Sequence, residues 1–168
     1  MTNQTVTSAC ISINSHRLPA ICRRIASLLQ PGTIIFDYGC GRYVDHVRDF
    51  FAGYGCQYIG YDPYNRTDTD NLDALMTWQH TDHSRCIGIC SNVLNVIDSD
   101  DVVRDVIVNL QGFARTCYYT VYEGDKSGTG RYPTSDSYQR NASLKSYAAY
   151  VPDGYKVRFF RGVMEVTQ

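Results

Sequence analysis

Blocks of apolar residues alternate with polar blocks along the first part of the chain, and their spacing predicts its elements. Apolar positions recur at three- and four-residue steps over 17–29, which predicts an amphipathic helix that ends at Pro31. Short apolar runs predict strands over 34–37 and 57–62, and a second helical pattern begins near Tyr43 between them. Strand, glycine turn, helix and strand in this order make one βαβ unit, in which the two strands lie parallel.

The rest of the chain continues the alternation of strand and helix. The predicted elements are an edge strand over 72–78, a buried strand over 85–90, a helix over 98–110, a strand over 114–122, a helix over 138–150 and a closing hairpin over 155–166. Such alternation is typical of α/β proteins with a mostly parallel sheet. We therefore expect an α/β fold whose sheet ends in an antiparallel hairpin.

Length, charge and hydropathy limit the possible classes of protein. The 168 residues fit one domain, since domains of roughly 100–150 residues are common. We expect a flexible polar arm over 1–15 and a single domain over 16–168. The net charge of −1 argues against a strongly basic nucleic-acid surface but leaves room for a local basic patch. No signal peptide is visible and no apolar run approaches the roughly 20 residues that span a bilayer, so we expect no membrane partner.

Cysteine and histidine residues are candidates for metal binding, but their spacing argues against it. The seven cysteines are scattered without a C-x-x-C pair, a pattern typical of reduced thiols in a cytosolic chain. His80 and His83 stand with Asp82 in a polar segment that lacks H-E-x-x-H spacing, which favours solvated surface over a metal site. We therefore expect no bound metal.

Acidic residues and glycines follow the first two predicted strands. Asp37 ends the first strand, and Gly39 and Gly41 form a tight turn after it. Asp62 ends the second strand. Glycines let the backbone approach a ligand closely, and an acid after the second strand can accept from both hydroxyls of a ribose. A dinucleotide-binding G-x-G-x-x-G motif is disfavoured, because Val44 stands where its third glycine belongs.

The segment 37–41, with the sequence DYGCG, closely resembles the acid-x-Gly-x-Gly loop of class I S-adenosylmethionine-dependent methyltransferases. Asp62 stands where that family keeps its ribose-binding acid. The resemblance implies a Rossmann-like three-layer sandwich and S-adenosylmethionine as cofactor. It also implies that Asp37 lies near the methionine amino end, with Gly39 and Gly41 facing the nucleoside and methionine portion.

One position of this loop departs from the family pattern. The family often has a small residue two positions after the second glycine, and this chain has Tyr43 there. We expect the Tyr43 ring beside the cofactor, where it either flanks the pocket or partly fills it. The alternative is a methyltransferase-like fold that has lost its cofactor.

A second segment, 91–97 with the sequence SNVLNVI, is similar to one that closes the floor of the active site beside the sulfonium in many class I methyltransferases. The resemblance implies that Ser91 lies beside the cofactor. Asn92 and Asn95 are the candidate catalytic residues, because an amide can hold a substrate amine lone pair toward the methyl group. The alternative for each asparagine is a backbone-capping contact at the start of the helix over 98–110.

A glycine-rich segment with basic, amide and aromatic residues follows the strand over 114–122. This mixture can pair with phosphate and stack on bases. The candidate substrate-binding residues are Tyr122, Arg131, Tyr138 and Arg140. Together with segment 91–97, this tail resembles a family of methyltransferase-like proteins found in phages and beside DNA-phosphorothioation genes. The alternative is a mobile lid rich in turn formers.

These resemblances imply transfer of a methyl group from S-adenosylmethionine to a nucleic-acid base, a nucleotide or a small-molecule nucleophile. A protein partner that supplies target recognition would suit so short a chain. The expected place of action is the cytoplasm, that of the host if the chain is phage-encoded. The alternative is a catalytically silent methyltransferase-like protein that binds a nucleotide or a host protein.

Overall fold

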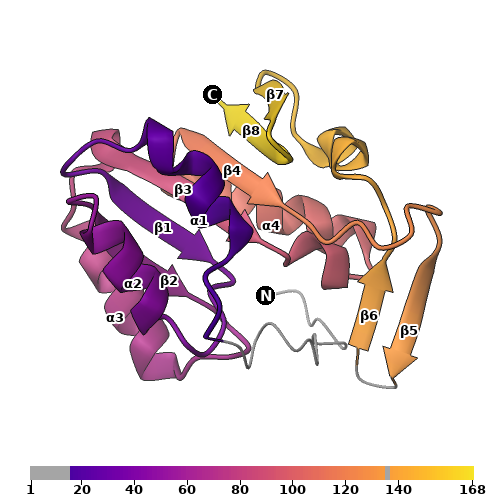
Figure 1. Ribbon diagram of the computed structural model, residues 1–168, viewed down its shortest axis with the longest axis horizontal. Helices are drawn as coiled ribbons and strands as arrows, with labels where there is room; N and C mark the ends of the chain where they lie inside the picture. Colours follow the sequence, from indigo (N-terminus) through magenta and orange to yellow (C-terminus); the bar gives the residue numbers. More distant parts are fainter. Residues whose placement is uncertain (1–15, 135–136) are drawn as a thin grey trace.

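Six strands form the central sheet of the computed structural model, which describes residues 16–134 and 137–168 (Figure 1). The strand order is β2-β1-β3-β4-β8-β7. Its strands are β1 (Ile34–Tyr38), β2 (Gln57–Tyr61), β3 (Cys86–Ser91), β4 (Thr116–Thr120), β7 (Lys156–Phe160) and β8 (Val163–Thr167). Strands β1 to β4 pair in parallel, and β8 pairs antiparallel with both β4 and β7. This arrangement confirms the predicted α/β fold, while the predicted arm over 1–15 lies outside the described residues.

Helices cover both faces of the sheet and complete three layers (Figure 1). The helices are α1 (Ala20–Ile25), α2 (Asp45–Ala52), α3 (Asp68–Gln79) and α4 (Asp100–Phe113), with 3₁₀ helices η1 (Ala26–Leu28), η2 (His83–Arg85), η3 (Leu94–Val96) and η4 (Leu144–Tyr150). Successive residues of a strand point to opposite faces. Ile35 therefore packs in the core under α1 and α2, whereas its neighbour Phe36 packs in the core under α3 and α4.

The register of the parallel strands brings their carboxyl ends to one edge of the sheet. Tyr38 of β1 lies opposite Tyr61 of β2, and Ser91 of β3 lies opposite Thr120 of β4. Ligands of open α/β sheets bind outside this edge. The loops that follow β1, β2, β3 and β4 therefore form the region where a site is expected.

The prediction of an edge strand over 72–78 is wrong, because these residues belong to helix α3. Thr67 and Asp70 form a capping box, in which each side chain accepts a hydrogen bond from the other residue's backbone N–H. Ala74 and Trp78, one helical turn apart, then both pack against the core on this face. The sheet consequently ends at β2 on this side.

The prediction of a helix over 138–150 is also wrong in its first part. Residues 137–140 form strand β6 (Ser137–Arg140), which pairs antiparallel with β5 (Gly130–Thr134) in a separate two-stranded ribbon. The side chains of Gln139 and Arg140 bond to residues more than 40 positions earlier in the chain, which no local pattern reveals. Figure 1 shows the ribbon beyond the carboxyl ends of β1 and β4.

The closing hairpin is confirmed by strands β7 and β8. Its two turn residues, Arg161 and Gly162, both have positive φ values of 46° and 70°. Two successive residues of this kind are typical of the tight turns that match the twist of a two-residue hairpin. The hairpin extends the sheet beyond β4 and lies away from the carboxyl edge of β1 and β2.

Candidate functional site

The glycine turn after β1 is held against both the second strand and segment 91–97. Gly39 and Gly41 have φ values of 85° and 76°, a region that favours glycine. The backbone N–H of Gly39 donates to the carbonyl of Tyr61 at 2.7 Å. A methyl group on Gly39 would overlap Cγ2 of Val93. The two segments that carry the methyltransferase resemblance therefore touch, and only a glycine allows this contact.

Asp37 is a buried carboxyl group beneath this turn. It is 4% exposed, and its Oδ2 accepts a hydrogen bond of 2.7 Å from the hydroxyl of Tyr58. Burial raises the pKa of Asp37 to about 7, the Tyr58 hydrogen bond opposes this rise, and the charge of Asp62 adds to it. Asp37 would gain from a cationic partner at this place, because an opposite charge favours the ionised form.

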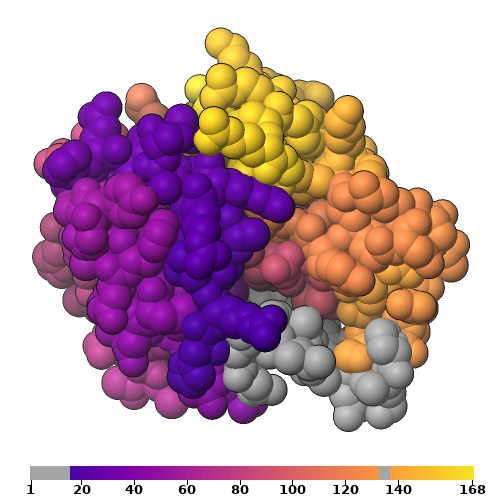
Figure 2. All heavy atoms as spheres, in the orientation of Figure 1, coloured from indigo at the N-terminus to yellow at the C-terminus, as the bar shows by residue number. Residues whose placement is uncertain are grey.

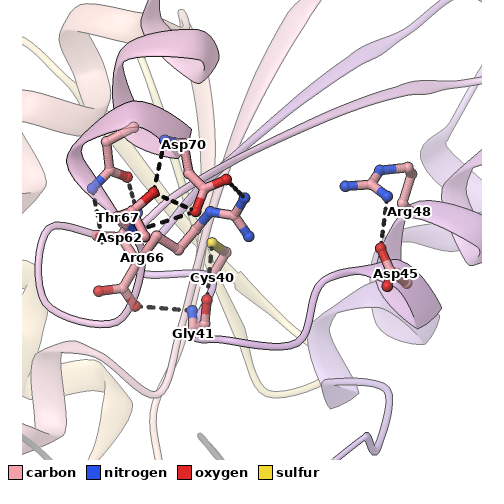
Figure 3. A network of polar contacts seen from close by, with 9 residues as sticks. Cys40, Gly41, Asp45, Arg48, Asp62, Arg66, Thr67 and Asp70 are labelled. Atoms are coloured by element: carbon pink, nitrogen blue, oxygen red, sulfur yellow. Dashed lines mark hydrogen bonds and ion pairs between the residues drawn. The ribbon is translucent and has the colours of Figure 1, made fainter.

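Asp62 organises the turn that follows β2, as Figure 3 shows in part. Its backbone is held by the side chain of Asn71, which accepts from the Asp62 N–H at 3.0 Å and donates to the Asp62 carbonyl at 2.9 Å. Its carboxylate accepts from the backbone N–H groups of Gly41 at 2.9 Å, Tyr64 at 2.9 Å and Asn65 at 3.0 Å. Asp62 thus links the glycine turn to the start of α3.

The neighbouring polar groups in Figure 3 stabilise the elements on either side of this turn. Arg66 forms an ion pair with Asp70 at 3.1 Å, inside the capped first turn of α3. Asp45 and Arg48 form a 2.7 Å ion pair in the first turn of α2. Both pairs join residues close in sequence and stabilise the helix starts, and Arg66 lies in the loop after β2 at the carboxyl edge.

Tyr43 lies at the surface of the glycine turn. Its side chain is 42% exposed, and its ring packs on His16 with the ring centroids 4.3 Å apart. The next helix is tied to the same region, because the Nε2 of His46 lies 3.2 Å from the carbonyl of Arg17. The Tyr43 ring therefore lies beside the glycine turn, and its expected place at the cofactor stays a prediction.

Ser91 and Asn92 join the carboxyl end of β3 to that of β4 through contacts with Thr120. The hydroxyl of Ser91 lies 3.1 Å from the hydroxyl of Thr120, which occupies the matching position of β4. Asn92 has a φ of 58° and donates its backbone N–H to the carbonyl of Thr120 at 2.8 Å. Asparagine tolerates this left-handed conformation better than most residues. The Asn92 side chain is exposed, so its amide is available at the edge.

Asn95 is placed differently from Asn92. It is 2% exposed, its Nδ2 donates to Oε1 of Gln139 at 3.2 Å, and its Oδ1 accepts from the backbone N–H of Tyr122 at 3.4 Å. Gln139 completes the link by donating to the carbonyl of Tyr122 at 3.1 Å. The polar atoms of Asn95 therefore connect η3, the end of β4 and the ribbon, and the structure does not bring them to the surface with Asn92.

The guanidinium group of Arg140 forms all of its described hydrogen bonds within the protein. Its Nε donates to the carbonyl of Ile97 at 3.2 Å, and its Nη2 donates to the carbonyl of Asp98 at 3.1 Å. Its Nη1 bonds to the carboxylate of Asp100 and to the hydroxyl of Tyr150 at 2.9 Å. All three guanidinium nitrogens therefore brace the ribbon against the start of α4.

The other candidate substrate-binding residues surround the ribbon. Tyr122 is 61% exposed although its backbone is held by Asn95, and Arg131 is exposed on β5. Tyr138 is half-buried, and its ring lies 5.1 Å from that of Tyr132, centroid to centroid. The ribbon therefore presents exposed aromatic rings together with the exposed guanidinium group of Arg131.

A groove of about 330 Å³ lies between residues 126–128 and η4. Lys126 and Arg140 supply its positive charge, and serine hydroxyls line much of the rest. Both cations already have acidic partners, since Lys126 lies 2.7 Å from Glu123 and Arg140 pairs with Asp100. The groove therefore carries little uncompensated charge for a phosphate.

The structural contacts include residues that the sequence patterns did not single out. They are Tyr58, Asn65, Asn71, Val93 and Gln139. Tyr58 lies opposite Ile35 in the register of β1 and β2, which places it on the same face of the sheet as Asp37. The others depend on loop conformation or on contacts between distant segments.

Within residues 16–134 and 137–168, no group of three His, Cys, Asp or Glu side chains could hold a metal ion. His80 and His83 bond to the carbonyls of Met76 and Trp78. The six cysteines of this part of the chain are free thiols. None of the helices described is both long and apolar enough to cross a membrane.

The carboxyl edge opens on the face of the molecule drawn in Figure 2. That view shows a hollow between the indigo residues that begin the described chain and the orange β5–β6 ribbon. In Figure 1, β1 and β4 point toward this side. The β5–β6 ribbon therefore lies on one side of this hollow, and β1 lies on the other side with the residues that begin the described chain.

Comparison with known proteins supports the fold assignment. The sequence matches no family model and no curated protein. A solved structure from work on the conversion of a disulfide bond into a thioacetal group during echinomycin biosynthesis has a TM-score of 0.56 and 12% identity, covering 93% of this chain and 86% of that one. A protein of the NADB-Rossmann superfamily from Streptococcus agalactiae has a TM-score of 0.40 and 11% identity, covering 90% of this chain and 67% of that one. The sheet order and the first of these likenesses assign the chain a Rossmann-like α/β fold.

Proposed function

We propose that this chain transfers a methyl group from S-adenosylmethionine to a nucleophile. The observation that carries the proposal is the contact of Gly39 with Val93, which joins the glycine turn to segment 91–97 at the carboxyl edge. Asp37 and Asp62 lie at the same edge, Asp37 one residue before the end of β1 and Asp62 directly after the neighbouring parallel strand β2. A fold alone does not imply a function, so the proposal rests on this arrangement of residues.

The residues present fit the chemistry of this cofactor. Asp37 is a buried carboxyl whose pKa is raised to about 7, and an ammonium group such as that of the methionine portion would compensate its charge. The Asp62 carboxylate keeps one side that its three backbone donors do not occupy, where ribose hydroxyls could bind, and Gly39 and Gly41 leave room for a close approach. Ser91 and Tyr43 would border the same pocket.

When bound, S-adenosylmethionine supplies an electrophilic methyl group on a positively charged sulfonium. The role of the chain is then to bind and align, which supplies much of the acceleration of such a displacement. Asn92 presents an exposed amide beside β3 that can orient the lone pair of the acceptor. Asn95 acts as a positioning residue, because it fixes the backbone of Tyr122.

The acceptor in this proposal is a nucleic-acid base, a nucleotide or a small molecule. The exposed rings of Tyr122 and Tyr132 favour a planar group that can stack. The pairing of Lys126 and Arg140 with acids argues against an extended phosphate backbone bound by this chain alone. A longer nucleic acid would therefore require a protein partner that contributes the recognition surface.

A second candidate function is binding without chemistry. It is favoured by Asp62, because three backbone N–H groups already donate to its carboxylate. It is also favoured by Asn95 and Arg140, because their side chains form hydrogen bonds within the protein. A methyltransferase-like fold of this kind would hold a nucleotide or a protein partner. Turnover distinguishes it from the first proposal.

The test is calorimetric titration of S-adenosylmethionine and S-adenosylhomocysteine into the wild type and Asp62→Asn, with Asp73→Asn as an exposed control on α3. We expect micromolar binding to the wild type and the control, and a loss of about tenfold or more in Asp62→Asn, because the amide has one accepting oxygen in place of two and its NH2 group would face a backbone N–H donor of the loop. S-adenosylhomocysteine release would then be measured with nucleosides, oligonucleotides and small amines. Binding without release would favour the second candidate, and no binding to the wild type would overturn the first.

A further inference from the structure

The carboxylate of Asp62 is nearly saturated by its own loop. Oδ1 accepts from the backbone N–H groups of Tyr64 and Asn65, and Oδ2 accepts from the backbone N–H of Gly41. A carboxylate has about four lone-pair sites. Three backbone donors therefore leave little acceptor capacity for a ligand, and any ligand must use the side of the carboxylate that these donors do not occupy.

The side chain of Asn65 covers that remaining capacity. Its Nδ2 lies 3.2 Å from Oδ1 and 3.1 Å from Oδ2 of Asp62, so one amide group bridges both oxygens. The amide shows that Oδ1 takes a third donor from this side, so the two hydroxyls of a ribose would approach the same two oxygens there, as the amide does. Of the four donors that the structure places on this carboxylate, the Asn65 amide is the one carried by a side chain.

We propose that the Asn65 side chain competes with the ribose of a bound nucleoside for Asp62. It occupies the diol-binding positions in the absence of ligand and rotates away when a nucleoside binds, so it lowers the affinity and sets how strongly a vicinal diol is preferred. This inference rests on the proposed binding of S-adenosylmethionine at the same site. The energetic basis is that a ligand must replace an existing hydrogen-bond partner before its own contacts add to the affinity.

The loop is built so that the side chain can leave without unfolding it. The backbone N–H groups of Tyr64 and Asn65 keep their bonds to Oδ1, and Asn71 holds the backbone of Asp62 from the other side. The capping box at Thr67 fixes the start of α3 independently. Removing the amide therefore leaves Asp62 with three backbone donors, and we expect Asn65→Ala to fold.

The experiment is calorimetric titration of S-adenosylhomocysteine, adenosine and 2′-deoxyadenosine into the wild type, Asn65→Ala and the control Gln79→Ala. Gln79 is an exposed amide in the last turn of α3. We expect Asn65→Ala to bind S-adenosylhomocysteine about three- to tenfold tighter, as removal of one competing hydrogen bond implies. Adenosine should gain more than 2′-deoxyadenosine, because only adenosine presents both hydroxyls. Gln79→Ala should match the wild type.

The ratio of the adenosine to the 2′-deoxyadenosine dissociation constant separates competition from a general change in the loop. A loop that merely became looser would change both affinities alike and leave the ratio unaltered. Equal or weaker binding of S-adenosylhomocysteine by Asn65→Ala would overturn the inference while leaving the proposed function intact. No binding of any of the three ligands to either protein would overturn the proposed function and the inference together.

Discussion

The two sides of the hollow at the carboxyl edge differ in how far their polar groups are satisfied. On the β1 side, Asp37 is buried with Tyr58 as its donor, and burial raises its pKa to about 7. On the ribbon side, Arg140 bonds through all three of its guanidinium nitrogens to acceptors of the protein. A buried acid with so little compensation lowers stability, whereas a saturated cation holds two segments together. The β1 side therefore keeps a carboxyl group that a cationic ligand group could compensate, whereas the guanidinium nitrogens of Arg140 on the ribbon side are already bonded.

The largest expected effect is on the free energy of unfolding, and it tests how far the buried carboxyl group of Asp37 on the β1 side destabilises the protein. The pKa of Asp37 rises from 3.8 to about 7 on folding, so the folded state binds a proton that the unfolded chain releases. The contribution of Asp37 to the stability of the wild type should therefore fall as pH rises from about 4 to about 7 and then level off, by up to about 4 kcal/mol. Asp37→Asn should remove this loss, so its advantage over the wild type should grow across the same window.

Urea unfolding of the wild type and Asp37→Asn at pH 4.5, 6 and 8 measures this difference, with Asp73→Asn as an exposed control. Other acids titrate in both proteins and cancel in the comparison. The thiols of Cys22, Cys40 and Cys90 face Asp37, and burial raises their pKa values, so they stay protonated in this range. A gap between the two proteins that does not change with pH would contradict the prediction.

The next effect tests the contact between the two motif segments. Gly39→Ala should lower the free energy of unfolding by about 3 kcal/mol, because the new methyl group meets Val93 and a φ of 85° disfavours alanine. Val93→Ala in the same chain should recover part of this loss, namely the steric part. Gly112→Ala is the matched control on α4, where the methyl group meets no atom within 4 Å, and it should stabilise the protein slightly. Thermal and urea unfolding measure all four proteins.

A smaller effect is expected where the ribbon is braced. Arg140→Met should lower the free energy of unfolding by about 2 kcal/mol, because it removes bonds to Ile97, Asp98 and Asp100. Arg104→Met is the control, since both side chains of its ion pair with Asp101 are exposed on α4 and its loss should have no measurable effect. Affinity for S-adenosylhomocysteine should stay unchanged in both variants. A loss of affinity in Arg140→Met alone would show that the ribbon side also binds the ligand. This would contradict the difference that we infer between the two sides.

The smallest expected effect concerns the helix that replaces the predicted edge strand. Thr67→Ala should destabilise the protein by about 1 kcal/mol, because it removes the side-chain acceptor of the capping box. Thr77→Ala, near the other end of α3, should be neutral or slightly stabilising, since alanine favours a helix more than threonine does. Circular dichroism during urea unfolding measures both. Equal behaviour of the two variants would contradict the role assigned to the cap.

Local patterns predicted the elements whose apolar positions are both periodic and buried. The strands β1, β2 and β3 and the helix α4 appear close to their predicted bounds, because their own residues supply the buried surface. Segment 72–78 carries apolar residues on two sides, and Leu72 and Met76 remain exposed in α3. Without the capping contacts of Thr67 and Asp70 in view, this composition does not distinguish an edge strand from a helix.

The candidate site likewise contains residues that local patterns predicted and residues whose placement depends on contacts between distant segments. Asp37, Asp62 and the glycines were predicted because a strand end and a tight turn have local signatures. The different placements of Asn92 and Asn95 were not, since they depend on a left-handed residue after β3 and on Gln139 of the ribbon. The phosphate-binding role expected for Arg140 stays a prediction, and its contacts with Asp100 and Tyr150 now weigh against it.

By itself, the sequence determined strands β1 to β4, helix α4, the closing hairpin, the glycine turn, the acid near the end of β1 and the acid after β2. Each of these depends on neighbouring residues, on periodicity, or on the conformational freedom of glycine. Only the tertiary structure decided that Val93 packs on Gly39, that Asp37 is buried beside Tyr58, and that the Asn65 amide bridges the oxygens of Asp62. Burial and hydrogen bonding arise from segments brought together by the whole fold, and they set the pKa of Asp37 and the free acceptor capacity of Asp62.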